Sequence, residues 1–175
     1  MDSKIKKHNK EMNNIIAPEP SFGKVIYEEE VFEISEAEIV IEKFSEKNLL
    51  YISAIASHYE LHDESKVYVQ DLGFSLLMPT TLNALESCKI NFPKSDSNHP
   101  EWEKTINSNF YRFEHLLITE CEIEITELEE GYLLELKGEY GEGIGSTYGG
   151  FKFEASLLAQ EKEKIDRNKN YFLSE

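Results

Sequence analysis

The chain has 175 residues, and its 40% of hydrophobic and 11% of aromatic residues are enough for one folded domain with its own core. Its 18 basic residues stand against 34 acidic ones, and the formal net charge of −16 disfavours nucleic acids and anionic membranes as partners. The two cysteines are far apart, so we expect a cytoplasmic protein without a disulfide framework.

The two ends of the chain differ in composition from its middle. Residues 1–20 are rich in Lys and Asn and end in Pro18-Glu19-Pro20, which predicts a flexible basic arm. Residues 161–175 read as a charged tail. A single domain is therefore expected over residues 21–160.

Strand-forming residues dominate the first half of this domain. Strands are expected over residues 25–34 and 37–44, where β-branched and aromatic side chains are frequent. Residues 49–57 are apolar on both faces, as in a covered strand or a buried helix, and their composition favours the strand. Residues 58–66 read as a polar connection, and 66–78 as another strand with Gly73 as a possible bulge.

Two helices are expected in the middle of the chain. Thr80 or Thr81, just after a proline, is suited to cap a short helix that runs to about residue 88. A second helix is expected to begin at Pro100, because an apolar face recurs at helical spacing in Trp102, Ile106 and Phe110.

The last third of the domain reads as antiparallel strands. Residues 118–127 alternate between apolar and acidic side chains, 132–140 return after a turn, and 151–158 alternate again. With the earlier elements, this predicts an α+β domain: a mostly antiparallel β-sheet of about seven strands with two or three short helices.

Six of the nine glycines lie between Gly138 and Gly150. A phosphate-binding loop would need a following helix or a Gly-Lys-Ser/Thr sequence, but an expected strand follows and the stretch contains no lysine. We interpret it as a hairpin connection. Its tyrosines, Tyr140 and Tyr148, are candidates for the rim of a partner contact.

A metal site is the main alternative for the chemistry of this chain. His58 and His62 are four residues apart and Asp63 follows, a spacing that suits two imidazoles and a carboxylate around a metal on a helix. The segment resembles a strand exit instead, so a solvated loop competes with this interpretation. No nucleophile or cofactor motif stands out, and we expect no cofactor and no enzymatic activity.

The alternating acidic residues suggest a binding face. The partner-binding residues that we predict are Glu120, Glu122, Glu124, Glu135 and Glu139, with Tyr140 and Tyr148. Such a face would attract a basic protein, so we predict a non-enzymatic binding protein, such as a bacterial toxin immunity protein or a nucleic-acid-mimicking inhibitor. Two alternatives remain open: a small-ligand or metal-binding module, enzymatic or not, that uses His58, His62 and Asp63, and a subunit of a larger complex.

Overall fold

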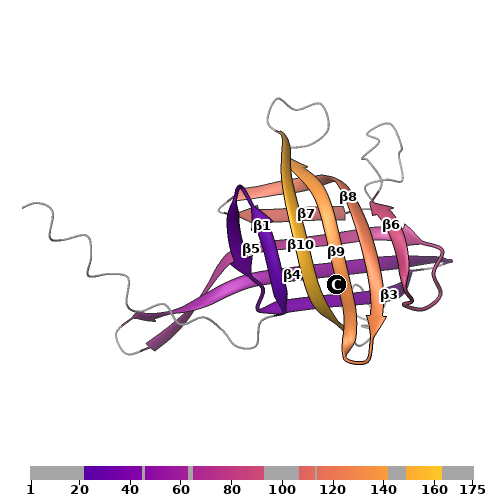
Figure 1. The fold of residues 1–175 in the computed structure, drawn as a ribbon, viewed down its shortest axis with the longest axis horizontal. Helices are drawn as coiled ribbons and strands as arrows, with labels where there is room; N and C mark the ends of the chain where they lie inside the picture. The colour runs from indigo at the N-terminus through magenta and orange to yellow at the C-terminus, as the bar shows by residue number, and fades with distance from the viewer. Residues whose placement is uncertain are drawn as a thin grey trace, which may run out of the picture.

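The computed structural model describes residues 22–44, 46–62, 65–92, 107–112, 114–141 and 149–162. Within these residues the regular backbone consists of ten β-strands and no helix (Figure 1). They are β1 (Gly23–Tyr27), β2 (Glu30–Glu33), β3 (Glu36–Phe44), β4 (Lys47–His62), β5 (Ser65–Thr80), β6 (Cys88–Phe92), β7 (Asn107–Arg112), β8 (Glu114–Leu128), β9 (Gly131–Gly141) and β10 (Gly149–Glu161).

Seven strands close into a β-barrel in the order β3-β4-β5-β7-β8-β9-β10. Neighbours are antiparallel except at the closure between β10 and β3, which is parallel and spans two residue pairs, Gln160 with Glu38 and Glu161 with Ile39. The β1–β2 hairpin adds to β10, and β6 adds to β8. In Figure 1, β8, β9 and β10 cross in front of β4, β5 and β7 at a steep angle. We call strands β2-β1-β10-β9-β8-β6 the front wall and β3-β4-β5-β7 the rear wall.

Aromatic side chains fill the middle of the barrel. Phe110 and Tyr140 stack with their ring centroids 4.4 Å apart, and Phe153 lies 5.3 Å from Phe110. Phe74 of the rear wall then meets Phe153 at 5.7 Å. Inward residues alternate with outward ones along most of the barrel strands, so the barrel has a packed core and most of its polar side chains lie outside.

The expected α+β class is wrong, because the described part of the chain has only strands. Thr80 accepts a hydrogen bond from the Leu82 N–H, as a helix cap would. However, the Leu82 carbonyl accepts from the Asn48 side chain, and Ser87 accepts from the Glu127 N–H. Residues of neighbouring strands thus form hydrogen bonds with this segment, and the chain enters β6 where the helix was expected to end.

The second expected helix lies mostly outside the described residues, which exclude 93–106. The described end of that segment belongs to strand β7, in which Ser108 and Phe110 are buried while Asn109 and Tyr111 are more exposed. Phe110 therefore faces the core at the period of a strand, and β7 pairs with both β5 and β8.

Several expected strands are confirmed, with different limits. The alternating segments 37–44, 118–127, 132–140 and 151–158 lie within β3, β8, β9 and β10. The expected strand 25–34 is instead a hairpin, turned by Glu28 and Glu29 at positive φ of 47° and 69°. The polar connection expected over 58–66 is mostly strand, because β4 runs to His62 and β5 begins at Ser65.

The glycine stretch lies between paired antiparallel strands, as expected of a hairpin connection. Gly141 of β9 is opposite Gly149 of β10, and Gly138 lies farther back within β9. Residues 142–148 are outside the described residues, as are the expected arm 1–20 and residues 163–175 of the expected tail.

Candidate functional site

The front wall brings the predicted acidic residues together on its outer face. In the pairing of β8 with β9, Glu120 lies directly opposite Glu139, and Glu124 lies directly opposite Glu135. Glu122 is opposite Lys137. All five predicted glutamates therefore share one face, arranged as two like-charged pairs and one pair of opposite charge.

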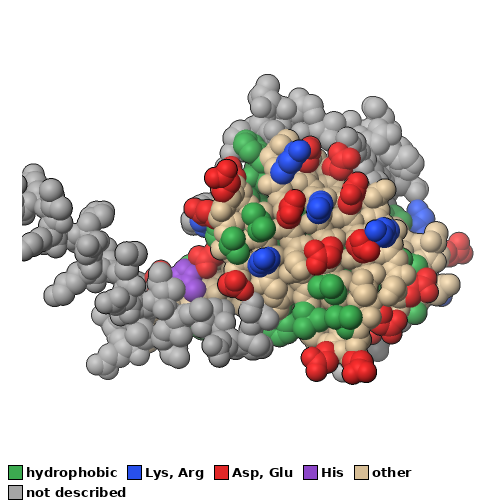
Figure 2. Space-filling model, viewed as in Figure 1, with side chains coloured by type: hydrophobic (Ala, Val, Ile, Leu, Met, Phe, Trp, Pro, Cys, Tyr) green, Lys and Arg blue, Asp and Glu red, His purple; other side chains and the backbone are tan. Residues whose placement is uncertain are grey.

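Basic and polar residues interleave with these glutamates, as Figure 2 shows for the whole face. Lys89 of β6 places its Nζ 2.8 Å from Glu124 Oε2, and this carboxylate raises the pKa of the lysine. Ser156 of β10 donates a hydrogen bond of 2.6 Å to Glu135. The face is thus a mixed lattice of charges and not a uniformly acidic surface. The sequence pattern did not predict that Lys89 and Ser156 contact these glutamates, because the two residues come from other strands.

A shallow hollow of about 450 Å³ lies in this face between β6, β8 and β9. Three of the predicted residues line it, Glu122, Glu124 and Glu135. The other lining residues are Lys89, Ile90, Asn91, Ile123 and Lys137. The hollow therefore offers three carboxylates and two ammonium groups over a partly apolar floor.

The two predicted tyrosines are not part of this described face. Tyr140 is 1% exposed and its ring lies in the aromatic core against Phe110. Tyr148 lies outside the described residues.

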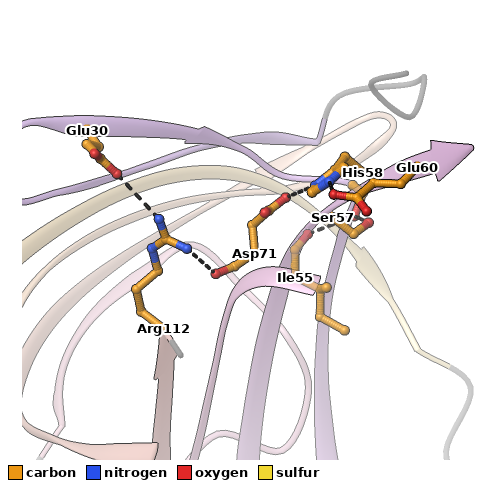
Figure 3. Close-up of polar contacts among 8 residues, drawn as sticks. Glu30, Ile55, Ser57, His58, Glu60, Asp71 and Arg112 are labelled. Carbon is orange, nitrogen blue, oxygen red and sulfur yellow. Dashed lines mark hydrogen bonds and ion pairs between the residues drawn. The ribbon is translucent and has the colours of Figure 1, made fainter. Parts of the chain in front are cut away.

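A second polar cluster lies at the base of the long β4–β5 hairpin, which extends past the barrel at the left of Figure 1. The register of the two strands shifts there: Ala56 pairs with Leu72, but Ser57 pairs with Gln70. This bulge leaves Asp71 without an opposite residue and turns its side chain toward His58 (Figure 3).

Both nitrogens of His58 meet carboxylates. Nδ1 lies 2.6 Å from Asp71 Oδ2, and Nε2 lies 3.2 Å from Glu60 Oε1. The hydrogen bond with Asp71 is the main cause that raises the pKa of His58; burial opposes it and Glu60 reinforces it. With both nitrogens engaged, this histidine is suited to hold the base of the β4–β5 hairpin together as a cation and not to activate a nucleophile.

Arg112 of β7 connects this cluster to the β1–β2 hairpin, as Figure 3 shows. Its guanidinium donates to the Asp71 carbonyl at 3.2 Å and lies 3.6 Å from the Glu30 carboxylate. The same group lies over the Phe32 ring, 4.7 Å from its centroid. Three elements that are far apart in sequence thus meet at one arginine.

Of the three residues in the predicted metal site, only His58 has a side chain that the structure describes. The side chain of His62 and all of Asp63 are outside the described residues. Over the part of the chain that the structure describes, no group of three or more His, Cys, Asp or Glu residues is arranged to hold a metal ion. The metal-binding module stays a prediction.

Comparisons with protein-family models, with curated proteins and with solved structures found no match to this chain. Its function is therefore inferred from its own residues. Within the described ranges, no helix has the length and apolar character needed to cross a membrane. The cytoplasmic location stays a prediction.

Proposed function

We propose that this chain is a non-enzymatic binding protein that neutralises a basic protein partner through the outer face of its front wall. Bacterial toxin immunity proteins and nucleic-acid-mimicking inhibitors are examples of this kind of protein. The observation that carries it is the pair Glu124 and Glu135, which lie directly opposite each other at a hollow that Glu122 also lines.

Like charges at opposite positions of paired strands destabilise a sheet by about 0.2–1 kcal/mol. Lys89 and Ser156 each contact one carboxylate of the pair and offset part of this repulsion. A lysine or arginine of a partner that enters the hollow would contact both carboxylates and turn the remaining repulsion into attraction.

The interleaved lysines make the proposed contact selective. A partner with only basic residues would meet Lys89 and Lys137 as well as the three glutamates of the hollow. The best complement therefore carries a basic side chain at the glutamate pair and an acidic or polar one beside the lysines. The net charge of −16 adds long-range steering, which speeds the encounter and weakens with salt.

The experiment compares two variants with the same change in charge. One replaces Glu122, Glu124 and Glu135 by glutamine; the control replaces the exposed residues Glu46, Glu86 and Glu129 by glutamine. A fluorescent peptide that alternates arginine and serine serves as the probe, because its polar residues can lie beside Lys89 and Lys137, and anisotropy gives its Kd at low and high salt.

We expect the first variant to bind the peptide about tenfold more weakly than the unmodified chain and the control to change Kd by less than about threefold. Equal losses in both variants would show that only the net charge attracts the peptide. That result, or a Kd unaffected by the first variant, would overturn the assignment of the face.

A further inference from the structure

The β4–β5 hairpin continues past the barrel as a two-stranded ribbon. Strand β3 pairs with β4 only as far as Ile55, and β7 pairs with β5 only from Gly73 onward. Among the described strands, residues 57–62 and 65–70 therefore pair with each other alone. An isolated two-stranded ribbon is only marginally stable in water, so a further strand at its edge would stabilise it.

The β5 edge of this ribbon lacks the usual protection against pairing. Residues 67–70, Val-Tyr-Val-Gln, contain no charge and no proline, and Val67 and Tyr68 are 41% and 45% exposed. Natural edge strands carry charges, prolines or bulges that block another strand. Here the bulge at Asp71 protects only the base of the ribbon. Edge strand β2, in contrast, has glutamates at both ends.

We propose that the β5 edge of the ribbon pairs antiparallel with the same edge of a second copy of the chain. Centred on Tyr68, this pairing sets Val67 opposite Val69 of the second copy and Lys66 opposite Gln70 of the second copy. It joins the two ribbons into one four-stranded sheet. No like charges face each other in this register, because Lys66 is its only charged residue.

Charge favours this edge over the other surfaces for contact between copies. Each chain carries −16, so two copies repel each other when their barrels approach. The ribbon projects from the barrel in Figure 1 and holds the two bodies apart, and screening in physiological salt acts over about 8 Å. The Tyr59 and Tyr68 rings, 5.7 Å apart edge to face, add an aromatic pair from each copy.

The test measures mass against concentration by sedimentation equilibrium, for the unmodified chain and two variants. Val67→Lys adds a charge to the proposed edge, and Val31→Lys is the matched control on β2, where the valine is 57% exposed. The short edge predicts a weak dimer, so the range is about 10 µM to about 1 mM.

The mass of the unmodified chain and of Val31→Lys is expected to rise from 20.3 kDa toward twice that value. Val67→Lys is expected to stay monomeric or to dimerise at least about tenfold more weakly. A monomer at all concentrations, or dimerisation of Val67→Lys equal to that of the unmodified chain, overturns the proposal.

Amide hydrogen exchange at the two ends of this concentration range locates the contact independently of the variants. Protection that increases with concentration at residues 67–70 supports the ribbon edge. Protection that increases on the front wall instead would refute it, since another surface would then join the copies.

Discussion

Replacing Gly138 by alanine is expected to destabilise the barrel, whereas the same change at Gly73 is expected to be nearly neutral. Gly138 lies in β9 between β8 and β10, opposite Phe153. A methyl group at this position would lie 2.6 Å from the Glu120 carbonyl oxygen and 2.6 Å from Cε1 of Phe153. Ordinary contacts begin at 3.4 Å, so both neighbours would have to move.

Neither neighbour can move freely, because one is backbone in a paired strand and the other is a ring that is 2% exposed. Overpacking of this kind costs about 1–3 kcal/mol. Alanine regains about 0.5–1 kcal/mol because glycine loses more conformational entropy on folding. The net loss at Gly138 is thus about 1–2 kcal/mol. At Gly73 a methyl group would meet the amide end of the exposed Gln70 side chain, which can rotate away.

The assay is thermal unfolding followed by circular dichroism, with urea unfolding as a second measure. In a chain of this length 1 kcal/mol corresponds to about 2–4 °C, so Gly138→Ala should lower Tm by about 2–8 °C. Gly73→Ala should stay within about 2 °C of the unmodified chain or exceed it. Equal Tm losses in both variants, or none at Gly138, would refute the close approach of β8, β9 and β10 described here.

Three further predictions concern the polar cluster at the base of the β4–β5 hairpin and the two cysteines. Because Asp71 raises the pKa of His58, the stabilisation from the charged imidazole is complete below about pH 6.5 and is lost as pH rises through the higher folded pKa. Asp71→Asn should therefore lower the midpoint of the His58 titration measured by NMR, and should make Tm depend less on pH. Arg112→Ala should lower the free energy of unfolding in urea by about 1–3 kcal/mol, and Arg112→Lys should recover only part, since an ammonium cannot reproduce the planar contacts. Burial raises the pKa of Cys121 to about 12, so at about pH 8 iodoacetamide should modify the half-buried Cys88 first and Cys121 only on unfolding, as mass spectrometry would show.

The strands with the clearest sequence pattern have one buried and one solvent-exposed face. Residues 118–127 and 151–158 alternate at period two, and the structure shows why: one set faces the core and the other faces the front of the molecule. The helix expected at Thr80 does not form, although Thr80 accepts the hydrogen bond of a helix cap, because this contact fixes only one turn of the chain. Whether a capped turn continues as a helix depends on partners elsewhere, here Asn48 and Glu127.

The polar regions were harder to predict, because they join distant segments. The five glutamates were placed on one face correctly, but the lysine that neutralises Glu124 comes from β6, a strand that the sequence pattern did not reveal. His58 was noticed for its spacing to His62, which suits a helix. In a strand, residues four apart are separated by about 13 Å. Its observed partner Asp71 depends on a bulge two positions before the glycine at which one was expected.

The closure of the barrel sets the order in which the chain can fold during synthesis. Residues 160 and 161 join β3 at residues 38 and 39, and Lys162 adds an ion pair of 2.7 Å with Glu38. A ribosome must therefore make and release more than 120 further residues before the early strand β3 obtains its second neighbour. Until then the outer edge of β3 has no paired strand, and contacts this distant in sequence form slowly. The barrel can therefore close only after synthesis has passed residue 161, however early its first strands pair.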